Sequence, residues 1–277
     1  MIRRFSARDG LQLAALDWEG PEGRTPILCL PGITRAAADF AGLAARHGAT
    51  RRVLAFDHAG HGDSARPAEL NRYRIEESLR DVLDGMAALH APRCVIVGTS
   101  YGGILAMVLA VLRPTALAGL VLNDVGPVLA PTGMAQVRDF LGTDPALPDL
   151  DACTAYMRRV QPPLAIDDAG WRRVTANTFA PGADGKFHPR WDIRIRQVMD
   201  AAGPPPDLRP AFGALAHVPL LLVHGLLSEL LLPETVAWMR AARPDMRVAE
   251  IDGSGHAPTL EEPAAIAAID AFLDAIP

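Results

Sequence analysis

A serine set between glycines is the residue of this chain best placed to act as a nucleophile. Gly98-Thr99-Ser100-Tyr101-Gly102 has the G-x-S-x-G spacing, with the buried, mostly β-branched run Cys94–Val97 before it and the apolar run Ile104–Leu112 after it. These flanks predict a strand, a sharp turn and a helix, the setting in which a strained turn lifts a serine hydroxyl above a sheet. The pattern predicts attack by Ser100 on an acyl group, and the alternative is an ordinary strand-to-helix turn.

A nucleophilic serine needs a base to take its proton. His256 lies in Gly253-Ser254-Gly255-His256-Ala257-Pro258, a loop of small residues after the last predicted strand, where an imidazole can reach across the strand ends. We therefore interpret His256 as the base. His58, His61 and His224 are rivals, because they too follow predicted strands.

The developing oxyanion needs two backbone donors. The N–H of Tyr101, directly after the nucleophile, is one candidate, and the N–H of Ile33, in the loop after the predicted strand 26–30, is the other. Gly32 would let that loop approach the substrate, and we expect Thr34 beside it to contact the substrate as well.

Strands and helices alternate along the chain, which predicts an α/β fold with helices on both faces of a mostly parallel sheet. We expect a three-layer α/β/α sandwich with a roughly eight-stranded sheet, opened by a hairpin turning at Arg8-Asp9-Gly10. Further strands are predicted over 26–30, 52–56, 94–97, 117–122, 219–223 and 247–251, and helices over 39–47, 75–90, 104–112, 233–242 and 263–275. In such sheets the chemistry lies at the carboxyl ends of the strands, where the candidate residues fall here.

A change of character over residues 128–210 predicts an inserted segment. Prolines and glycines punctuate short amphipathic pieces there, and the segment is rich in aromatic residues. We expect core residues 1–127 and 211–277 to form one domain and 128–210 a helical cap. Four residues of this segment are candidates to line the substrate pocket, although each could instead belong to the cap's own core: Met134, Phe140, Trp171 and Trp191.

Composition excludes several classes of protein. The 277 residues are 49% hydrophobic and 21% charged with a net charge of −5, which suits a globular domain and argues against a nucleic-acid partner. The first ten residues lack the apolar core of a signal peptide, and no run of apolar residues is long enough to span a membrane. Cys29, Cys94 and Cys153 form no C-x-x-C pair or zinc-like cluster, so we expect reduced thiols and a cytoplasmic protein, monomeric or homodimeric.

Five motifs in order give the chain a resemblance to the α/β-hydrolase fold superfamily: Leu30–Arg35, Asp57–Ser64, Gly98–Gly103, Leu122–Pro127 and Gly253–Pro258. The resemblance covers the whole chain and implies a nucleophile–acid–histidine triad in that order, no cofactor and no metal, and a helical cap inserted after the sixth core strand. It departs from the family at Ala59, where members often carry arginine, and in the apolar loop 225–232, where members often carry the acid of the triad.

Two carboxylates are therefore candidates for the acid. Asp124 follows the strand after the nucleophile helix, a position used by some members of the superfamily that the chain resembles. Glu229 lies in the loop after the strand 219–223, the commoner position. We favour Asp124 because it emerges at a strand end beside Ser100.

These residues predict a serine hydrolase for a small-molecule carboxylic ester or lactone, acting through an acyl-enzyme. Hydrolysis of a carbon–carbon or amide bond on the same triad is an alternative. A small-molecule receptor that closes its cap and turns over slowly is another.

Overall fold

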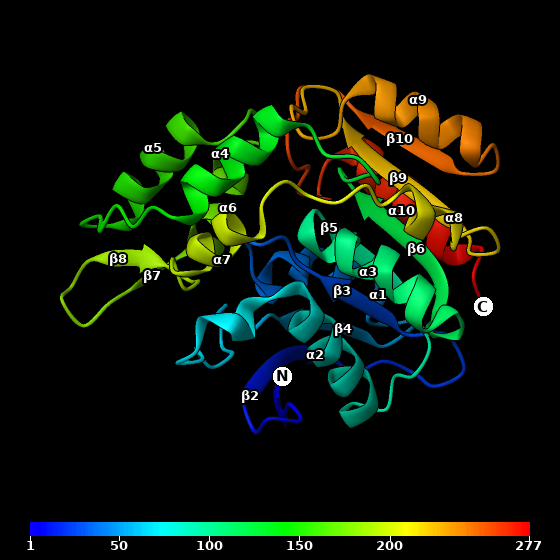
Figure 1. Ribbon diagram of the computed structural model, residues 1–277, viewed down its shortest axis with the longest axis horizontal. Helices are drawn as coiled ribbons and strands as arrows, with labels where there is room; N and C mark the ends of the chain where they lie inside the picture. Colours follow the sequence, from blue (N-terminus) through cyan, green and yellow to red (C-terminus); the bar gives the residue numbers. More distant parts are fainter.

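The computed structural model describes residues 1–277 and is built on an eight-stranded sheet with the order β1-β2-β4-β3-β5-β6-β9-β10 (Figure 1). The strands are β1 (Ile2–Ser6), β2 (Gln12–Trp18), β3 (Ile27–Leu30), β4 (Val53–Asp57), β5 (Cys94–Thr99), β6 (Leu117–Asn123), β9 (Leu220–Gly225) and β10 (Arg247–Ile251). Strand β2 runs antiparallel to both β1 and β4, and every other pair in the sheet is parallel.

The register of the parallel strands brings their ends to one edge. Gly98 of β5 pairs with Leu30 of β3 on one side and with Leu122 of β6 on the other. Asn123 of β6 in turn pairs with Val223 of β9. The loops that follow these strands therefore leave the sheet side by side, which is what gathers distant motifs into one site.

Ten α-helices accompany the sheet: α1 (Ala41–His47), α2 (Ile75–Ala88), α3 (Tyr101–Leu112), α4 (Pro131–Leu141), α5 (Leu150–Val160), α6 (Asp168–Thr178), α7 (Ile195–Ala202), α8 (Arg209–Gly213), α9 (Pro233–Ala242) and α10 (Pro263–Asp274). Short 3-10 helices lie at Ala37–Phe40 (η1), Leu70–Tyr73 (η2) and Pro114–Ala116 (η3). None of the helices combines the length and the apolar character needed to cross a membrane.

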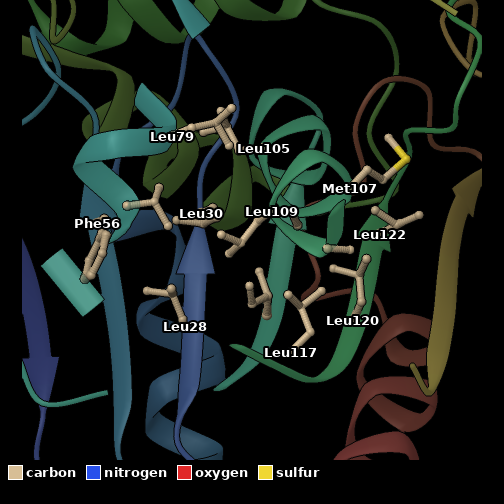
Figure 2. Packing of buried hydrophobic residues seen from close by; sticks show 14 of the residues in the cluster. Leu28, Leu30, Phe56, Leu79, Leu105, Met107, Leu109, Leu117, Leu120 and Leu122 are labelled. Atoms are coloured by element: carbon tan, nitrogen blue, oxygen red, sulfur yellow. The ribbon is translucent and has the colours of Figure 1, made fainter. Parts of the chain in front are cut away.

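The helices cover both faces of the sheet and give the predicted three layers. On one face α2, α3, α8 and α9 contribute to a cluster of 40 buried residues that includes Leu79, Leu105 and Leu109 (Figure 2). On the other face α1 and α10 contribute to a cluster of 21 buried residues with Leu43 and Phe272. The α/β fold class is therefore confirmed, and burial of this apolar surface is the main force holding it together.

The starts of two helices differ from the sequence prediction. The helix expected over 39–47 begins as the 3-10 turn η1 and becomes α-helical only at Ala41. Helix α3 begins at Tyr101, before the apolar run, because glycines let its first turn lie against the sheet. A Cβ on Gly102 would lie 2.0 Å from the carbonyl oxygen of Leu30, and one on Gly103 would lie 2.4 Å from Cγ1 of Val125.

The chain between β6 and β9 leaves the sheet and returns to it. Helices α4 to α7 and the small hairpin β7 (Phe179–Pro181) with β8 (Phe187–Pro189) form a group beside the sheet, in the upper left of Figure 1. The N–H of Leu208 donates to the carbonyl of Pro127 at 2.8 Å, so the two ends of this segment meet. Helix α8 follows and packs on the core through Phe212.

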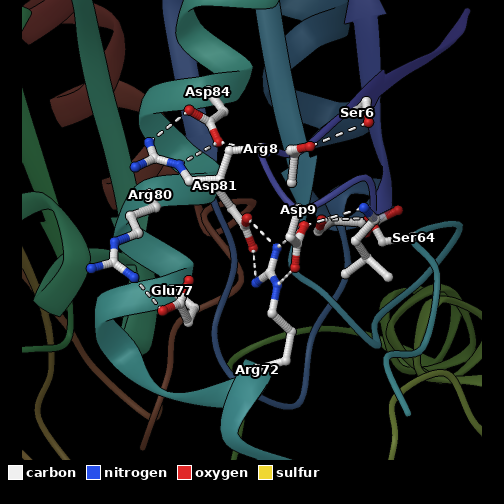
Figure 3. A network of polar contacts seen from close by, with 12 residues as sticks. Ser6, Arg8, Asp9, Ser64, Arg72, Glu77, Arg80, Asp81 and Asp84 are labelled. Atoms are coloured by element: carbon white, nitrogen blue, oxygen red, sulfur yellow. Dashed lines mark hydrogen bonds and ion pairs between the residues drawn. The ribbon is translucent and has the colours of Figure 1, made fainter. Parts of the chain in front are cut away.

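A polar network fixes the first hairpin to α2 (Figure 3). Arg72 of η2 donates to Asp81 of α2 at 2.6 and 2.9 Å and to Asp9 of the hairpin turn at 2.5 Å. Arg8 and Asp84 make a second link between the same elements. Both links pair arginine with aspartate, and we interpret these ion pairs as structural contacts between the hairpin and α2.

Candidate active site

Ser100 occupies the sharp turn between β5 and α3. Its backbone has φ 49° and ψ −112°, a conformation that costs a non-glycine residue about 1–3 kcal/mol. A Cβ on Gly98 would lie 2.6 Å from the backbone nitrogen of Gly103, so the turn admits no side chain at that position. The spacing of the motif thus follows from the packing of strand, turn and helix.

Three side chains from three loops meet at this edge of the sheet. Nε2 of His256 lies 2.9 Å from Oγ of Ser100, and Nδ1 of the same ring lies 2.8 Å from Oδ2 of Asp124. The imidazole can therefore accept the serine proton through Nε2 while the carboxylate holds the opposite nitrogen as an N–H. The structure brings together the predicted nucleophile, the predicted base and one of the two predicted acids.

The side chain of Asp124 is fully buried, and every polar neighbour of its carboxylate donates to it. Besides His256, it accepts hydrogen bonds from Nδ1 of His224 at 3.2 Å, from the N–H of Gly225 at 2.9 Å and from Oγ of Ser228 at 2.6 Å. Burial alone would raise its pKa, but the hydrogen bonds from His224, His256 and Ser228 outweigh burial and hold the pKa below its usual value. Asp124 is therefore kept as a carboxylate, and His224 lies against this acid.

Glu229, the other candidate acid, lies elsewhere. It is exposed, and its carboxylate contacts the side-chain amide of Gln136 in α4. Its neighbour Ser228, which sequence reasoning did not single out, is the residue of this loop that reaches the site. The available signal was a hydroxyl group in a loop made mostly of leucines.

Neither of the two predicted oxyanion donors has a hydrogen-bond acceptor in the structure. The N–H groups of Ile33 and Tyr101 donate no hydrogen bond within the chain. The Ile33 loop lies close to the nucleophile, because a Cβ on Gly32 would be 3.6 Å from Cβ of Ser100. Two free amides beside a serine hydroxyl can stabilise the charge that develops on a carbonyl oxygen.

Two buried histidines hold the loop that carries Ile33. Nε2 of His58 lies 3.0 Å from the carbonyl oxygen of Pro31, and Nε2 of His61 lies 2.6 Å from that of Ile33. Burial lowers the pKa of both rings, that of His58 to about 3, so both stay neutral at physiological pH. These rival candidates for the base act instead as positioning residues for the loop.

Comparison with known proteins agrees with this geometry. A model of the alpha/beta hydrolase family matches residues 27–269. The chain belongs to the alpha/beta hydrolase family. It is 32% identical to a 3-hydroxybutyrate-oligomer hydrolase of Cupriavidus necator, over 94% of this chain and 92% of that one. It is 26% identical to a 2-(acetamidomethylene)succinate hydrolase of Mesorhizobium japonicum, over 92% and 90%. The crystal structure of an alpha/beta hydrolase from Novosphingobium aromaticivorans superposes with a TM-score of 0.94 at 35% identity, covering 100% of this chain and 98% of that one.

In this alpha/beta hydrolase a pocket opens above Ser100 and His256. Of the predicted substrate contacts, Gly32, Thr34 and Phe140 line it. Residues of α5 and the loop after it, which the sequence did not indicate, complete its apolar wall: Met157, Val160 and Leu164. The pocket therefore lies between the strand-end loops and the segment between β6 and β9.

Three predicted contacts lie outside the pocket lining. Trp171 is packed in a small apolar cluster with Cys153, Met157, Val174 and Phe179, which forms the interior of the inserted segment. Trp191 packs its ring against Phe140 and donates Nε1 to the carbonyl of Leu141 at 2.9 Å. Met134 is half-buried on α4. The aromatic residues of the sequence indicated where apolar side chains gather. They could not show whether a given residue lines the pocket or packs inside the inserted segment.

Proposed function

We propose that this protein is a serine hydrolase for small carboxylic esters or lactones. The observation that carries the proposal is the continuous line of hydrogen bonds from Ser100 through His256 to Asp124. An exposed carboxylate or an unaligned histidine would not support acyl transfer, whereas this line gives each group the role that the chemistry requires.

The reaction proceeds in two halves. In the first, Nε2 of His256 takes the Ser100 proton as Oγ bonds to the ester carbon, and the amides of Ile33 and Tyr101 hold the oxyanion. The imidazolium then gives its proton to the departing alkoxide as the carbon–oxygen bond breaks, leaving an acyl-serine. In the second half His256 takes a proton from water, the hydroxide attacks the acyl carbon, and Oγ regains the proton as the acid departs.

We propose that residues 128–210 act as the cap of a core formed by 1–127 and 211–277. The cap supplies Phe140 and Met157 to the pocket, so it would set the size and shape of the substrate. The Cupriavidus relative is named for hydrolysis of an oligomeric hydroxy-acid ester, which supports the ester assignment.

Amide hydrolysis on the same residues is the second candidate. The Mesorhizobium relative, which is 26% identical, is named for a substrate that contains an acetamido group. A lower kcat/KM on an ester than on the amide with the same acyl group would favour this second candidate.

The test combines covalent labelling with turnover. A fluorophosphonate probe should label Ser100, and Ser100→Ala should lose both labelling and on the order of 10⁶-fold in kcat on nitrophenyl esters and lactones while remaining folded. Retention of wild-type turnover by Ser100→Ala would contradict the proposal. Labelling of Ser100 with only a single turnover would favour a receptor.

A further inference from the structure

The pocket above Ser100 contains one ion pair. Arg35 is the only lysine or arginine among the lining residues, and Asp39 is the only aspartate or glutamate. Arg35 follows the proposed oxyanion residue Ile33 by two positions. Its Cγ and the Cβ of Ser100 lie 3.4 and 3.6 Å from the point that a Gly32 Cβ would occupy. The cationic side chain therefore begins beside the nucleophile.

Asp39 and Arg35 differ in how many of their polar atoms have a hydrogen-bond partner. Asp39 accepts from Nε of Arg35 at 2.7 Å through Oδ2 and from the side-chain amide of Asn177 at 3.0 Å through Oδ1, so both of its oxygens are occupied. The side chain of Arg35 donates only through Nε, and neither Nη1 nor Nη2 has a hydrogen-bond partner within the chain. A guanidinium has five N–H groups, so four N–H donors of Arg35 have no partner within the chain and are available to an anion.

The pair is also held in place. Asp39 lies on η1, and the first N–H of that turn, from Ala37, donates to the buried carboxylate of Asp57 at 2.8 Å. Asn177 holds the other oxygen of Asp39 from helix α6 of the inserted segment. Asp39 thus fixes one edge of the guanidinium and leaves its planar fork available, the geometry that suits bidentate binding of a carboxylate.

We propose that Arg35 binds a free carboxylate on the substrate, which narrows the proposed ester hydrolase to esters that carry an ionised carboxyl group besides the ester bond that is cleaved. This inference rests on the proposed function. The carboxylate could lie on the acyl side, as in a half-ester of a dicarboxylic acid, or on the alcohol side, as in an ester of a hydroxy acid. The alternative is that Arg35 and Asp39 form a surface ion pair with no ligand.

Two substrate pairs separate these cases. Methyl hydrogen succinate and its neutral amide, methyl succinamate, place the group on the acyl side. 3-Acetoxybutyrate and 3-acetoxybutanamide place it on the alcohol side. The measurement is kcat/KM for each, in the wild type and in Arg35→Gln. A site built to bind a charged group should prefer the charged member of one pair by about tenfold or more, and Arg35→Gln should bring that ratio to about one.

A matched control is available in the cap. Arg196 pairs with Asp200 at 2.7 Å with the same i,i+4 spacing as Arg35 and Asp39, but it does not line the pocket. Arg196→Gln should keep the wild-type ratio. Arg35→Lys keeps the charge without the fork and should give an intermediate ratio, with thermal melts showing that each variant is folded.

Equal rates on the charged and neutral members of both pairs, or a ratio that survives Arg35→Gln, would overturn the inference while leaving an ester hydrolase. Absence of turnover on all four compounds would count against the proposed function. In that case calorimetric titration of Ser100→Ala with both charged esters, repeated in Ser100→Ala/Arg35→Gln, decides the question for Arg35. If Ser100→Ala binds a charged ester and the added Arg35→Gln abolishes that binding, the carboxylate site is supported. If the binding is the same in both variants, or if neither variant binds, the inference is overturned.

Discussion

The loops at the carboxyl edge of the sheet and the inserted segment between β6 and β9 are built in different ways. At the sheet edge the polar groups are buried and multiply bonded, as with Asp124, which accepts from four donors. The inserted segment has a separate apolar cluster of five buried residues, and ion pairs such as Arg158–Asp168 lie in solvent. Buried networks fix positions closely, whereas a small apolar core with a solvated surface can repack. The difference supports the proposal that the chemistry takes place at the sheet edge and that the insert sets the fit of the substrate.

The two regions are in contact close to the proposed active site. The N–H of Ala165 donates to Oγ of Ser254 at 2.9 Å, and the N–H of Gly255 donates to the carbonyl of Pro163 at 2.7 Å. Both contacts join the inserted segment to the loop that carries His256. These two hydrogen bonds therefore give a change in the insert a direct route to the loop that carries His256.

The largest expected effect in this comparison comes from the acid. Asp124→Asn removes the charge that stabilises the imidazolium and fixes its tautomer, so kcat should fall by about 10⁴-fold. Glu229→Gln should cost far less, because Glu229 is exposed and contacts Gln136 instead of the histidine. Steady-state kinetics on one ester measures both. The reverse order would move the role of acid to Glu229 and break the assignment of chemistry to the buried edge.

The sheet edge was more predictable from sequence than the insert, for physical reasons. A β-branched run followed by Gly98-Thr99-Ser100-Tyr101-Gly102 has few ways to pack, so strand, turn and helix could be placed from local pattern. The sequence favours Asp124 over Glu229 as the carboxylate that reaches His256 but does not decide between them, because the outcome depends on how the apolar loop after β9 folds. Ser228 and the two histidines that hold the Ile33 loop act through backbone atoms and buried contacts that local pattern does not record.

The predictions for the insert were weaker because an aromatic side chain can pack in a pocket wall as well as in an apolar interior. Trp171 and Phe140 have the same local signal, an apolar ring on a short amphipathic helix. Only the packing of α4, α5 and α6 against one another turns Trp171 inward, at 6% exposure, and leaves Phe140 at the pocket.

An effect of intermediate size is expected when Phe140 and Trp171 are substituted one at a time. Phe140→Ala enlarges the pocket and should shift the preference among acyl chain lengths by about tenfold, with thermal stability reduced less than by Trp171→Ala. Trp171→Ala empties the interior of the insert and should lower the free energy of unfolding by about 3–5 kcal/mol, with a smaller change in preference. A series of nitrophenyl esters and thermal melts measure the two properties. An unchanged preference profile in Phe140→Ala would mean that the insert does not line the site.

The smallest effect contrasts histidines in the two regions. His58 at the sheet edge has its pKa lowered to about 3 by burial, whereas the hydrogen bonds that the ring of His188, on the β7–β8 hairpin of the insert, donates to Asp184 and then to Asp144 raise the pKa of His188. A raised pKa in the folded state stabilises the fold below the unfolded pKa of about 6.5, and this contribution is lost as pH rises through the folded value. The difference in melting temperature between wild type and His188→Gln should therefore shrink as pH rises from about 6 to about 9, and it should shrink with added salt because the pair is solvated. NMR titration of the His188 ring, repeated in Asp184→Asn and Asp144→Asn, gives the pKa directly, and a value at or below 6.5 in the wild type would show that these surface contacts do not persist in solution.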